Sequence, residues 1–326
     1  MIRPRNNADR ARIGSNFLEV LLSTPENPSK IAQTLLDTWR SRGAFHDIFG
    51  HRVFCCVAGP EDAEPLLLLH GFPTSSLDFH RVIDTWAQRY RVVVHDHLGF
   101  GFSDKPANYS YSLVEQAEVA VELWRRLGIP RGHLLGHDYG TSVATELLAR
   151  RERDLLPVDF SSVTLANGSA HIEMSKLRLS QKIARSPLGP LFGRLVTRGY
   201  FIRVMARLWG DRRRIHPGEL DAMWDAISVN QGQHRTHELS RYIGERYRYW
   251  HRWIGALERL DLPAHVLWGC RDPVAVPAIA EQLAREIPGA KLTWFDDLGH
   301  YPMLEEPEDW GAAAMAFWDE GVASAD

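Results

Sequence analysis

Asp138 stands where the chain passes from an expected strand into an expected helix, in the segment Gly136-His137-Asp138-Tyr139-Gly140. Glycines two residues before and two residues after it allow a sharp turn around a strained central residue, the kind of turn that exposes a nucleophile. A carboxylate attacks without first losing a proton, so it can displace a leaving group at a saturated carbon and form an alkyl ester on the protein. The alternative is an Asp that only caps the following helix.

Two further segments offer the other groups that such a reaction needs. Asp272 in "RDPV" and His300 in "LGHY" each follow an expected strand, and the order Asp138, Asp272, His300 is that of nucleophile, acid and base. We predict that Asp272 orients His300, and that His300 activates the water that hydrolyses the ester. The backbone N–H groups of Phe72, in "HGFPTSS", and of Tyr139 are predicted to form the oxyanion hole.

The elements that must position these residues are buried strands. Six apolar runs, most of them separated by helical patterns, are "EPLLLLHG", "RVVVHDHLG", "GHLLGHD", "SSVTLANG", "AHVLWGC" and "KLTWFDD". Runs that are apolar on both faces indicate parallel strands covered by helices on both sides. The sequence therefore predicts an α/β fold with a mostly parallel, doubly wound sheet, whose strands carry the site at their carboxyl ends.

Other patterns set the expected domain organisation. A helical pattern at residues 28–42 and a hairpin around Gly50 come before the first apolar run, and a helical stretch at residues 79–88 separates the first run from the second. Between Gly168 and Ala264 the apolar spacing is helical, with many basic and aromatic residues and no convincing strand. We predict a helical extension at residues 1–43, an α/β core at 44–168 and 259–326, and an inserted helical cap at 169–258.

Composition excludes several classes of protein. With 326 residues, 44% hydrophobic and 24% charged, the chain has the composition of a soluble globular protein, and a net charge of -3 gives no reason to expect nucleic-acid binding. Residues 171–258 carry 16 Lys+Arg and 8 Asp+Glu, hence +8 against -11 for the remainder. This basic segment indicates either a solvated surface or weak attraction to an anionic membrane surface or substrate.

Cysteine content and the first residues indicate a cytoplasmic protein. The three cysteines include Cys55 and Cys56, which point to opposite faces if they lie on a strand, so a disulfide framework is not expected. The polar first segment fits neither a secretory signal nor a membrane span.

Aromatic residues of the cap predict an apolar pocket for a small or chain-like hydrophobic substrate, although core packing explains such residues equally well. The pocket candidates are His137, Trp209, Tyr242, Tyr247, Tyr249 and Trp253. No metal or other cofactor is expected, because the chemistry needs none and no glycine-rich phosphate loop or nicotinamide fingerprint follows a strand. The histidines of "HDH" at residues 95–97 are expected to hydrogen-bond to loops rather than to hold a metal.

The motifs "HGFPTSS", "DHLGFGFSDKP", "GHDYG", "RDPV" and "GHYPMLEEP" together resemble the α/β-hydrolase superfamily, and within it the epoxide hydrolases and haloalkane dehalogenases that use an Asp nucleophile. A closer likeness, which adds "RWIGAL", is to the mesoderm-specific transcript family. It covers nearly the whole chain from about residue 30. Members of that family commonly carry an amino-terminal membrane segment, which is not expected here. The resemblance implies a two-step hydrolysis through an ester on Asp138.

Two departures from the resembling families bear on the substrate. Tyr139 stands where dehalogenases usually have Trp, and Ile254 stands where epoxide hydrolases usually have a second cap tyrosine. An epoxide-hydrolase-like activity is the first interpretation, with dehalogenation or cleavage of a β-lactone or ester as alternatives. A ligand-binding protein without catalysis is the alternative of another class. A serine hydrolase is excluded because no G-x-S-x-G occurs at the turn. The sequence predicts neither the oligomeric state nor the donor of the leaving-group proton.

Overall fold

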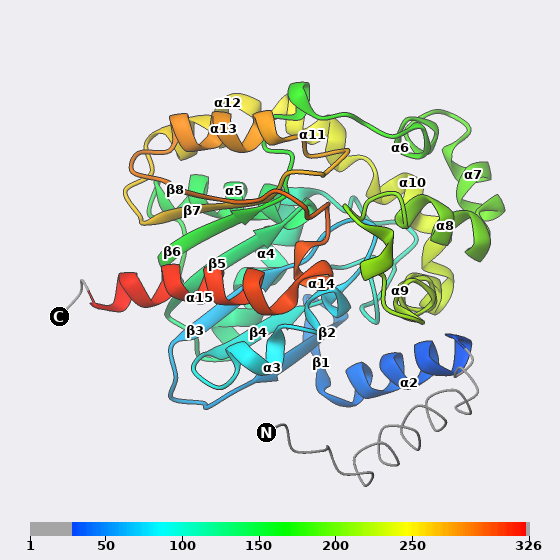
Figure 1. The fold of residues 1–326 in the computed structure, drawn as a ribbon, viewed down its shortest axis with the longest axis horizontal. Coiled ribbons are helices and arrows are strands. Elements are labelled where there is room, and N and C mark those ends of the chain that lie inside the picture. Colours follow the sequence, from blue (N-terminus) through cyan, green and yellow to red (C-terminus); the bar gives the residue numbers. More distant parts are fainter. Residues whose placement is uncertain (1–27, 324–326) are drawn as a thin grey trace, which may run out of the picture.

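One eight-stranded sheet forms the centre of the computed structural model, which describes residues 28–323 (Figure 1). The strand order is β1-β2-β4-β3-β5-β6-β7-β8. The first two strands and the β2–β4 pair are antiparallel, and every other pair is parallel. The strands are β1 (Gly43–Ile48), β2 (His51–Ala58), β3 (Pro65–Leu69), β4 (Arg91–His95), β5 (Arg131–His137), β6 (Asp159–Ala166), β7 (Ala264–Gly269) and β8 (Lys291–Phe295). The predicted α/β fold and the hairpin around Gly50 are confirmed.

Each face of the sheet packs against its own layer of helices because successive side chains of a strand point to opposite faces. Leu67 and Leu69 belong to one core cluster, and Leu66 and Leu68 to the other. The first cluster includes residues of α4 (Leu113–Arg126), α5 (Tyr139–Arg151), α12 (Trp250–Glu258) and α13 (Pro277–Glu286). The second includes residues of α2 (Pro28–Ser41), α3 (Ile83–Trp86) and α15 (Pro307–Ala323). The free thiols of Cys55 and Cys56 are divided between the two clusters in the same way.

A long helical insertion connects β6 to β7. Its elements are η2 (Ile172–Met174), α6 (Leu179–Ala184), α7 (Gly189–Leu195), α8 (Arg198–Met205), η3 (Arg212–Arg214), α9 (Glu219–Ser228), η4 (Val229–Arg235), α10 (Thr236–Leu239), α11 (Tyr242–Arg248) and α12. Residues 169–263, all of them described, contain no strand. The helix α9 packs against α2, so the insertion also contacts the amino-terminal helix.

Some expectations differ from the structure or lie outside it. The single helical stretch expected at residues 79–88 is wrong. It is divided between η1 (Ser76–Phe79) and α3, because the N–H groups of His80 and Val82 bind carbonyls three residues earlier rather than four. The first 27 residues of the expected extension lie outside the described part. Within residues 28–323, no helix is both long and apolar enough to cross a membrane.

Candidate active site

The turn between β5 and α5 has the sharp geometry expected from its glycines. Asp138 has φ 46° and ψ -106°, a conformation that residues with a side chain rarely adopt. A Cβ atom on Gly140 would lie 2.2 Å from the carbonyl oxygen of Leu69, so only glycine fits there. The side chain of Asp138 makes no capping hydrogen bond to α5. The helix-cap alternative is therefore wrong, because the carboxylate binds a different loop.

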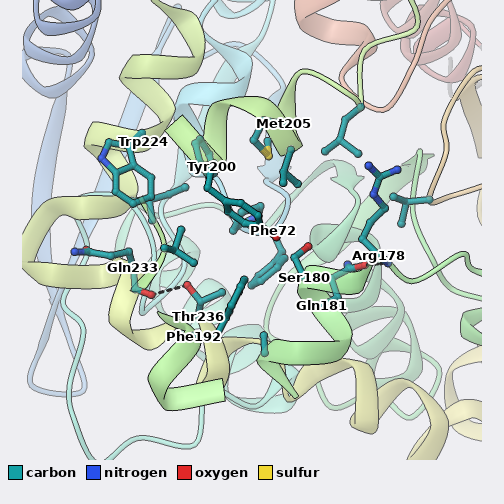
Figure 2. Close-up of a pocket in the computed structure, with 18 of the residues that line it drawn as sticks. Phe72, Arg178, Ser180, Gln181, Phe192, Tyr200, Met205, Trp224, Gln233 and Thr236 are labelled. Atoms are coloured by element: carbon teal, nitrogen blue, oxygen red, sulfur yellow. Dashed lines mark hydrogen bonds between the residues drawn. The ribbon is translucent and has the colours of Figure 1, made fainter. Parts of the chain in front are cut away.

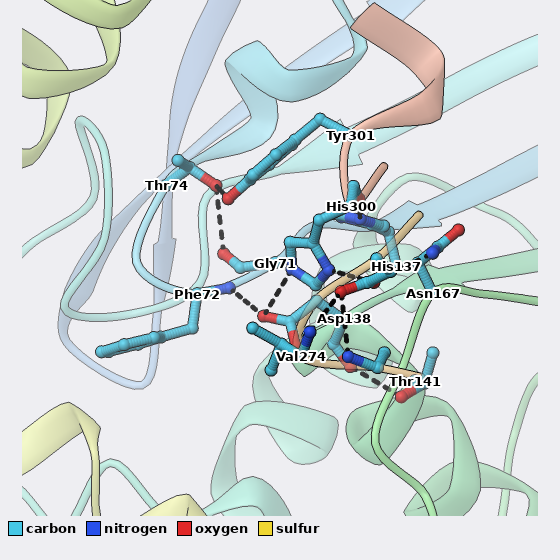
Figure 3. A network of polar contacts seen from close by, with 12 residues as sticks. Gly71, Phe72, Thr74, His137, Asp138, Thr141, Asn167, Val274, His300 and Tyr301 are labelled. Atoms are coloured by element: carbon cyan, nitrogen blue, oxygen red, sulfur yellow. Dashed lines mark hydrogen bonds and ion pairs between the residues drawn. The ribbon is translucent and has the colours of Figure 1, made fainter. Parts of the chain in front are cut away.

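That carboxylate faces two groups from other strand ends (Figure 3). The backbone N–H of Phe72, after β3, donates to Asp138 Oδ2 over 2.9 Å, and His300 Nε2, after β8, lies 4.0 Å from the same oxygen. Tyr139 is the first residue of α5, where backbone N–H groups have no partner within the helix. One oxygen of the Asp138 carboxylate thus accepts a backbone N–H and also lies near the imidazole of His300.

Four hydrogen bonds hold the carboxylate that orients His300. Asp272 Oδ2 accepts from His300 Nδ1 over 2.6 Å and from Asn167 Nδ2 over 2.9 Å. Asp272 Oδ1 accepts the backbone N–H groups of Val274 and Ala275 over 2.7 and 3.0 Å. With Nδ1 bound in this way, the imidazole is fixed with Nε2 turned toward Asp138.

The charges around His300 determine whether it carries a proton. Burial by itself lowers the pKa of this imidazole, but attraction to Asp272, the hydrogen bond to Asp272, and the nearby Asp138 and Asp78 outweigh it and raise the pKa to about 9. At neutral pH the resting site therefore holds an imidazolium. Loss of the negative charge of Asp138 would lower this pKa and let the imidazole accept a proton.

Sequence reasoning missed two groups that hold these loops in place. Asn167 follows β6 directly with φ 41°, and its Oδ1 accepts the N–H of Gly269 over 2.9 Å. The carboxylate of Glu305 accepts the N–H groups of Gly299 and Gly210 over 2.8 and 2.9 Å, which connects the His300 loop to the insertion. The position of Asn167 at a strand end was a usable signal. Glu305 had no comparable signal because it does not follow a strand and its partner in the insertion, Gly210, is 95 residues away.

Arg246 of α11 was also missed, although it contacts the nucleophile turn. This arginine is 2% exposed, and it donates from Nε to Ser142 Oγ over 2.6 Å and from Nη2 to the carbonyl oxygen of Asp138 over 3.2 Å. Its guanidinium carbon lies 4.5 Å from the ring centroid of Tyr242. It forms no ion pair with any residue in the described range 28–323. A buried positive charge therefore supports the backbone of the turn without a carboxylate of its own.

Asp138 and His300 line an apolar cavity with about 840 Å³ of empty space, a volume that includes its opening to solvent. Figure 2 shows the other residues of its wall. Most of its wall comes from the insertion. The apolar lining residues are Phe72, Pro73, Ala184, Phe192, Val196, Phe201, Val204, Met205, Leu208, Trp224, Ile227 and Val274. The polar ones, apart from Asp138 and His300, are Arg178, Ser180, Gln181, Tyr200, Gln233 and Thr236. The arrangement suits a hydrophobic ligand with its reacting atom next to the Asp138 carboxylate.

The six pocket residues suggested by the sequence do not line this cavity. Three of them lie beneath or beside it. His137 is fully buried with Nε2 2.7 Å from the carbonyl oxygen of His300, and Trp209 stacks on Tyr301 with ring centroids 5.1 Å apart. Tyr242 is buried against the rings of Phe72 and Tyr139.

The other three lie on α11, on α12 and, in the case of Tyr249, between these helices, and none of them lines the cavity. Tyr247 is 52% exposed, and Tyr249 packs on Trp253. Trp253 donates its indole N–H to Glu146 over 2.8 Å. Helical spacing could not separate these tyrosines and tryptophans from residues such as Tyr200 and Trp224, because the side of each helix that faces the cavity depends on how the insertion folds over the sheet.

The histidines at residues 95–97 do not serve the loops as expected. Both rings are fully buried, and their nitrogen atoms have no hydrogen-bond partner in the described part of the chain. The two rings pack against each other, and that of His97 also packs against the rings of His70 and Tyr139. Burial lowers the pKa of His95 to about 3. Among residues 28–323, no group of three or more His, Cys, Asp or Glu side chains is placed to hold a metal ion.

Comparison with known proteins gives consistent matches. The family model of the alpha/beta hydrolase fold matches residues 64–307. The Mycobacterium tuberculosis protein LipZ, whose name describes it as a hydrolase, is 39% identical over 278 residues, which cover 85% of this chain and 96% of LipZ. The mesoderm-specific transcript homolog protein of Homo sapiens is 37% identical over 292 residues, with 86% and 87% of the two chains covered. The predicted likeness to the mesoderm-specific transcript family is confirmed.

A solved structure shows the same fold at lower identity. The haloalkane dehalogenase DbeA from Bradyrhizobium elkani matches with a TM-score of 0.74 at 22% identity, covering 87% of this chain and 99% of that one.

Proposed function

Since this chain belongs to the α/β-hydrolase fold family, we propose that it hydrolyses a hydrophobic electrophile, in the first place an epoxide, through an ester on Asp138. One observation carries the proposal. The Asp138 carboxylate is held by the Phe72 N–H at 2.9 Å, faces His300 at 4.0 Å, and lies in the wall of an apolar cavity. An aspartate that served only the fold would not need this exposure to a ligand-sized space.

In the first step, a carboxylate oxygen of Asp138 attacks a ring carbon of the epoxide. The new C–O bond forms as the ring C–O bond breaks, and the ring oxygen takes a proton. Of the four tyrosines of the insertion, only Tyr200 lines the cavity, and a phenol is a stronger acid than the hydroxyls of Ser180 and Thr236 in the same wall. We assign Tyr200 as the proton donor.

In the second step, water attacks the ester carbonyl of Asp138. Esterification removes the negative charge of Asp138, so the pKa of His300 falls and the imidazolium releases its proton, which restores the phenol of Tyr200 directly or through solvent. The free Nε2 of His300 then takes one proton of the attacking water. The N–H groups of Phe72 and Tyr139 stabilise the oxyanion of the tetrahedral intermediate. When that intermediate collapses, the acyl C–O bond to the substrate breaks, the leaving oxygen takes the second proton of the water, and the diol leaves. The Asp138 carboxylate is restored, and His300 keeps the proton that it took from the water, so the site is back at rest.

One alternative substrate class is less well supported by the structure. In a dehalogenase, the residue after the nucleophile would donate to the departing halide. Here Tyr139 is fully buried beneath the cavity wall and does not line it.

A binding protein without catalysis is also less well supported, because it would have no need of the four donors that fix Asp272 behind His300. A small hydrophobic substrate and a cytoplasmic location remain predictions.

The test is intact-protein mass spectrometry on the His300→Gln variant, incubated with a panel of epoxides, haloalkanes and β-lactones. Without its base the protein should accumulate the ester, and peptide mapping should place the added mass on Asp138. The double variant Asp138→Asn/His300→Gln is the matched control and should remain unmodified. A folded His300→Gln variant that gains no mass from any class would refute the covalent mechanism.

A further inference from the structure

We propose that the outer side of α6–α8 docks on the surface of an anionic phospholipid bilayer. The docking surface is defined by Leu179, Leu188, Leu191 and Leu195, together with the basic side chains of residues 176–207. The inference does not depend on the chemistry at Asp138.

Leucines are concentrated on this part of the molecule. The described chain exposes five leucines by more than half, and four of them are those of the docking surface, with exposures of 71%, 64%, 55% and 67% in sequence order. Leu188 directly precedes α7, and Leu191 and Leu195 lie within it. Their spacing of three and four residues places all three on one side of the helix. A cluster of exposed large apolar side chains usually indicates an interaction site.

The charge of the same segment is of one sign. Residues 176–207 contain eight Lys and Arg and no Asp or Glu. Arg198 pairs with Asp221 and Asp225, whereas the other seven form no ion pair with a residue in the described range. Six of these seven, Lys176, Lys182, Arg185, Arg194, Arg203 and Arg207, are exposed. Exposed leucines and unpaired cations in one segment match an anionic interface, in which apolar side chains enter the acyl boundary and the cations meet lipid phosphates.

Docking of this segment on a bilayer would place the bilayer next to the cavity. The α6–α8 helices lie at the edge of the molecule in Figure 1, and their inner side supplies Gln181, Phe192 and Tyr200 to the cavity wall. The same short helices therefore face solvent with leucine and face the cavity with aromatic and polar groups. A bilayer bound to the outer side would lie next to the cavity wall, where a hydrophobic molecule dissolved in the bilayer is concentrated.

The test is co-sedimentation of the full chain with vesicles of equal parts phosphatidylglycerol and phosphatidylcholine, compared with vesicles of phosphatidylcholine alone. We expect binding to the anionic vesicles that weakens as salt is added. The triple variant Leu188→Glu/Leu191→Glu/Leu195→Glu should reduce the bound-to-free ratio by about tenfold or more. Leu155→Glu, at the fifth exposed leucine, is the matched control and should bind like the wild type.

Three results would overturn the proposal. The wild type could fail to bind the anionic vesicles at low salt, or the triple variant could bind as well as the wild type while remaining folded by circular dichroism. In the third case, the wild type would form a concentration-dependent dimer that the triple variant loses, without vesicle binding. The leucines would then belong to an interface between two copies of the chain. None of these results depends on catalytic activity, so the adduct experiment at Asp138 is decided separately.

Discussion

Replacing Asp138 with Asn tests whether the nucleophile controls the proton on His300. The substitution removes one negative charge but keeps the size of the side chain, so it imitates the neutral ester. Asp138 and His300 are 5% and 3% exposed, and Asp138 Oδ2 lies 4.0 Å from His300 Nε2. At this separation two unit charges attract by about 4 kcal/mol at an effective dielectric constant of about 20. Since about 1.4 kcal/mol changes a pKa by one, this attraction is large enough to bring the pKa of His300 from about 9 into the neutral range.

The assay is a pH titration of the side-chain nitrogen resonances of histidine by NMR. The His300 signals are identified by their absence from the His300→Gln spectrum. We expect the pKa of His300 to fall by at least about one pH unit in Asp138→Asn. Asp84→Asn, which alters an exposed carboxylate paired with Arg42, should leave it unchanged.

Stability should show the same coupling. Because the folded-state pKa of His300 is raised, the protonated imidazole stabilises the fold fully below about pH 6.5, and this stabilisation is lost as the pH rises through about 9. In Asp138→Asn the stabilisation should be smaller, and its loss should be complete at a lower pH. If the NMR pKa of His300 is the same in Asp138→Asn and in the wild type, Asp138 does not hold the proton on His300, and the proposed release of the base by esterification is wrong.

Two further substitutions test the supports of the site. Arg246→Met should lower the free energy of unfolding by about 3 kcal/mol in urea titrations, because Ser142 and the carbonyl of Asp138 lose a charged donor. It should also slow adduct formation in the His300→Gln background, and an unchanged rate would remove Arg246 from the site. Trp253→Phe should lower the free energy of unfolding by only about 1 kcal/mol, because it removes the one hydrogen bond from the indole to Glu146. It should leave turnover unaltered. A marked change in substrate preference would show that Trp253 does reach the ligand.

The sequence by itself determined the parts that depend on short stretches of chain. Continuous apolar runs predict the buried strands, and the paired glycines around Asp138 predict the sharp turn, because only glycine fits where backbones meet at Gly140. The side chains after successive parallel strands gather at one edge of the sheet, so the strand order also brought Asp138, Asp272 and His300 together.

Tertiary structure decided which side chains of the insertion reach the cavity and which charges meet. The pattern of helical residues is the same for Tyr200, which lines the cavity, and for Tyr247, which faces solvent. Arg246 reaches the turn from more than a hundred residues away in the chain, and the pKa of His300 is raised by Asp272 and Asp138, which follow different strands. Packing distances and Coulomb interactions between residues far apart in sequence leave no local pattern, and only the folded chain brings them into contact.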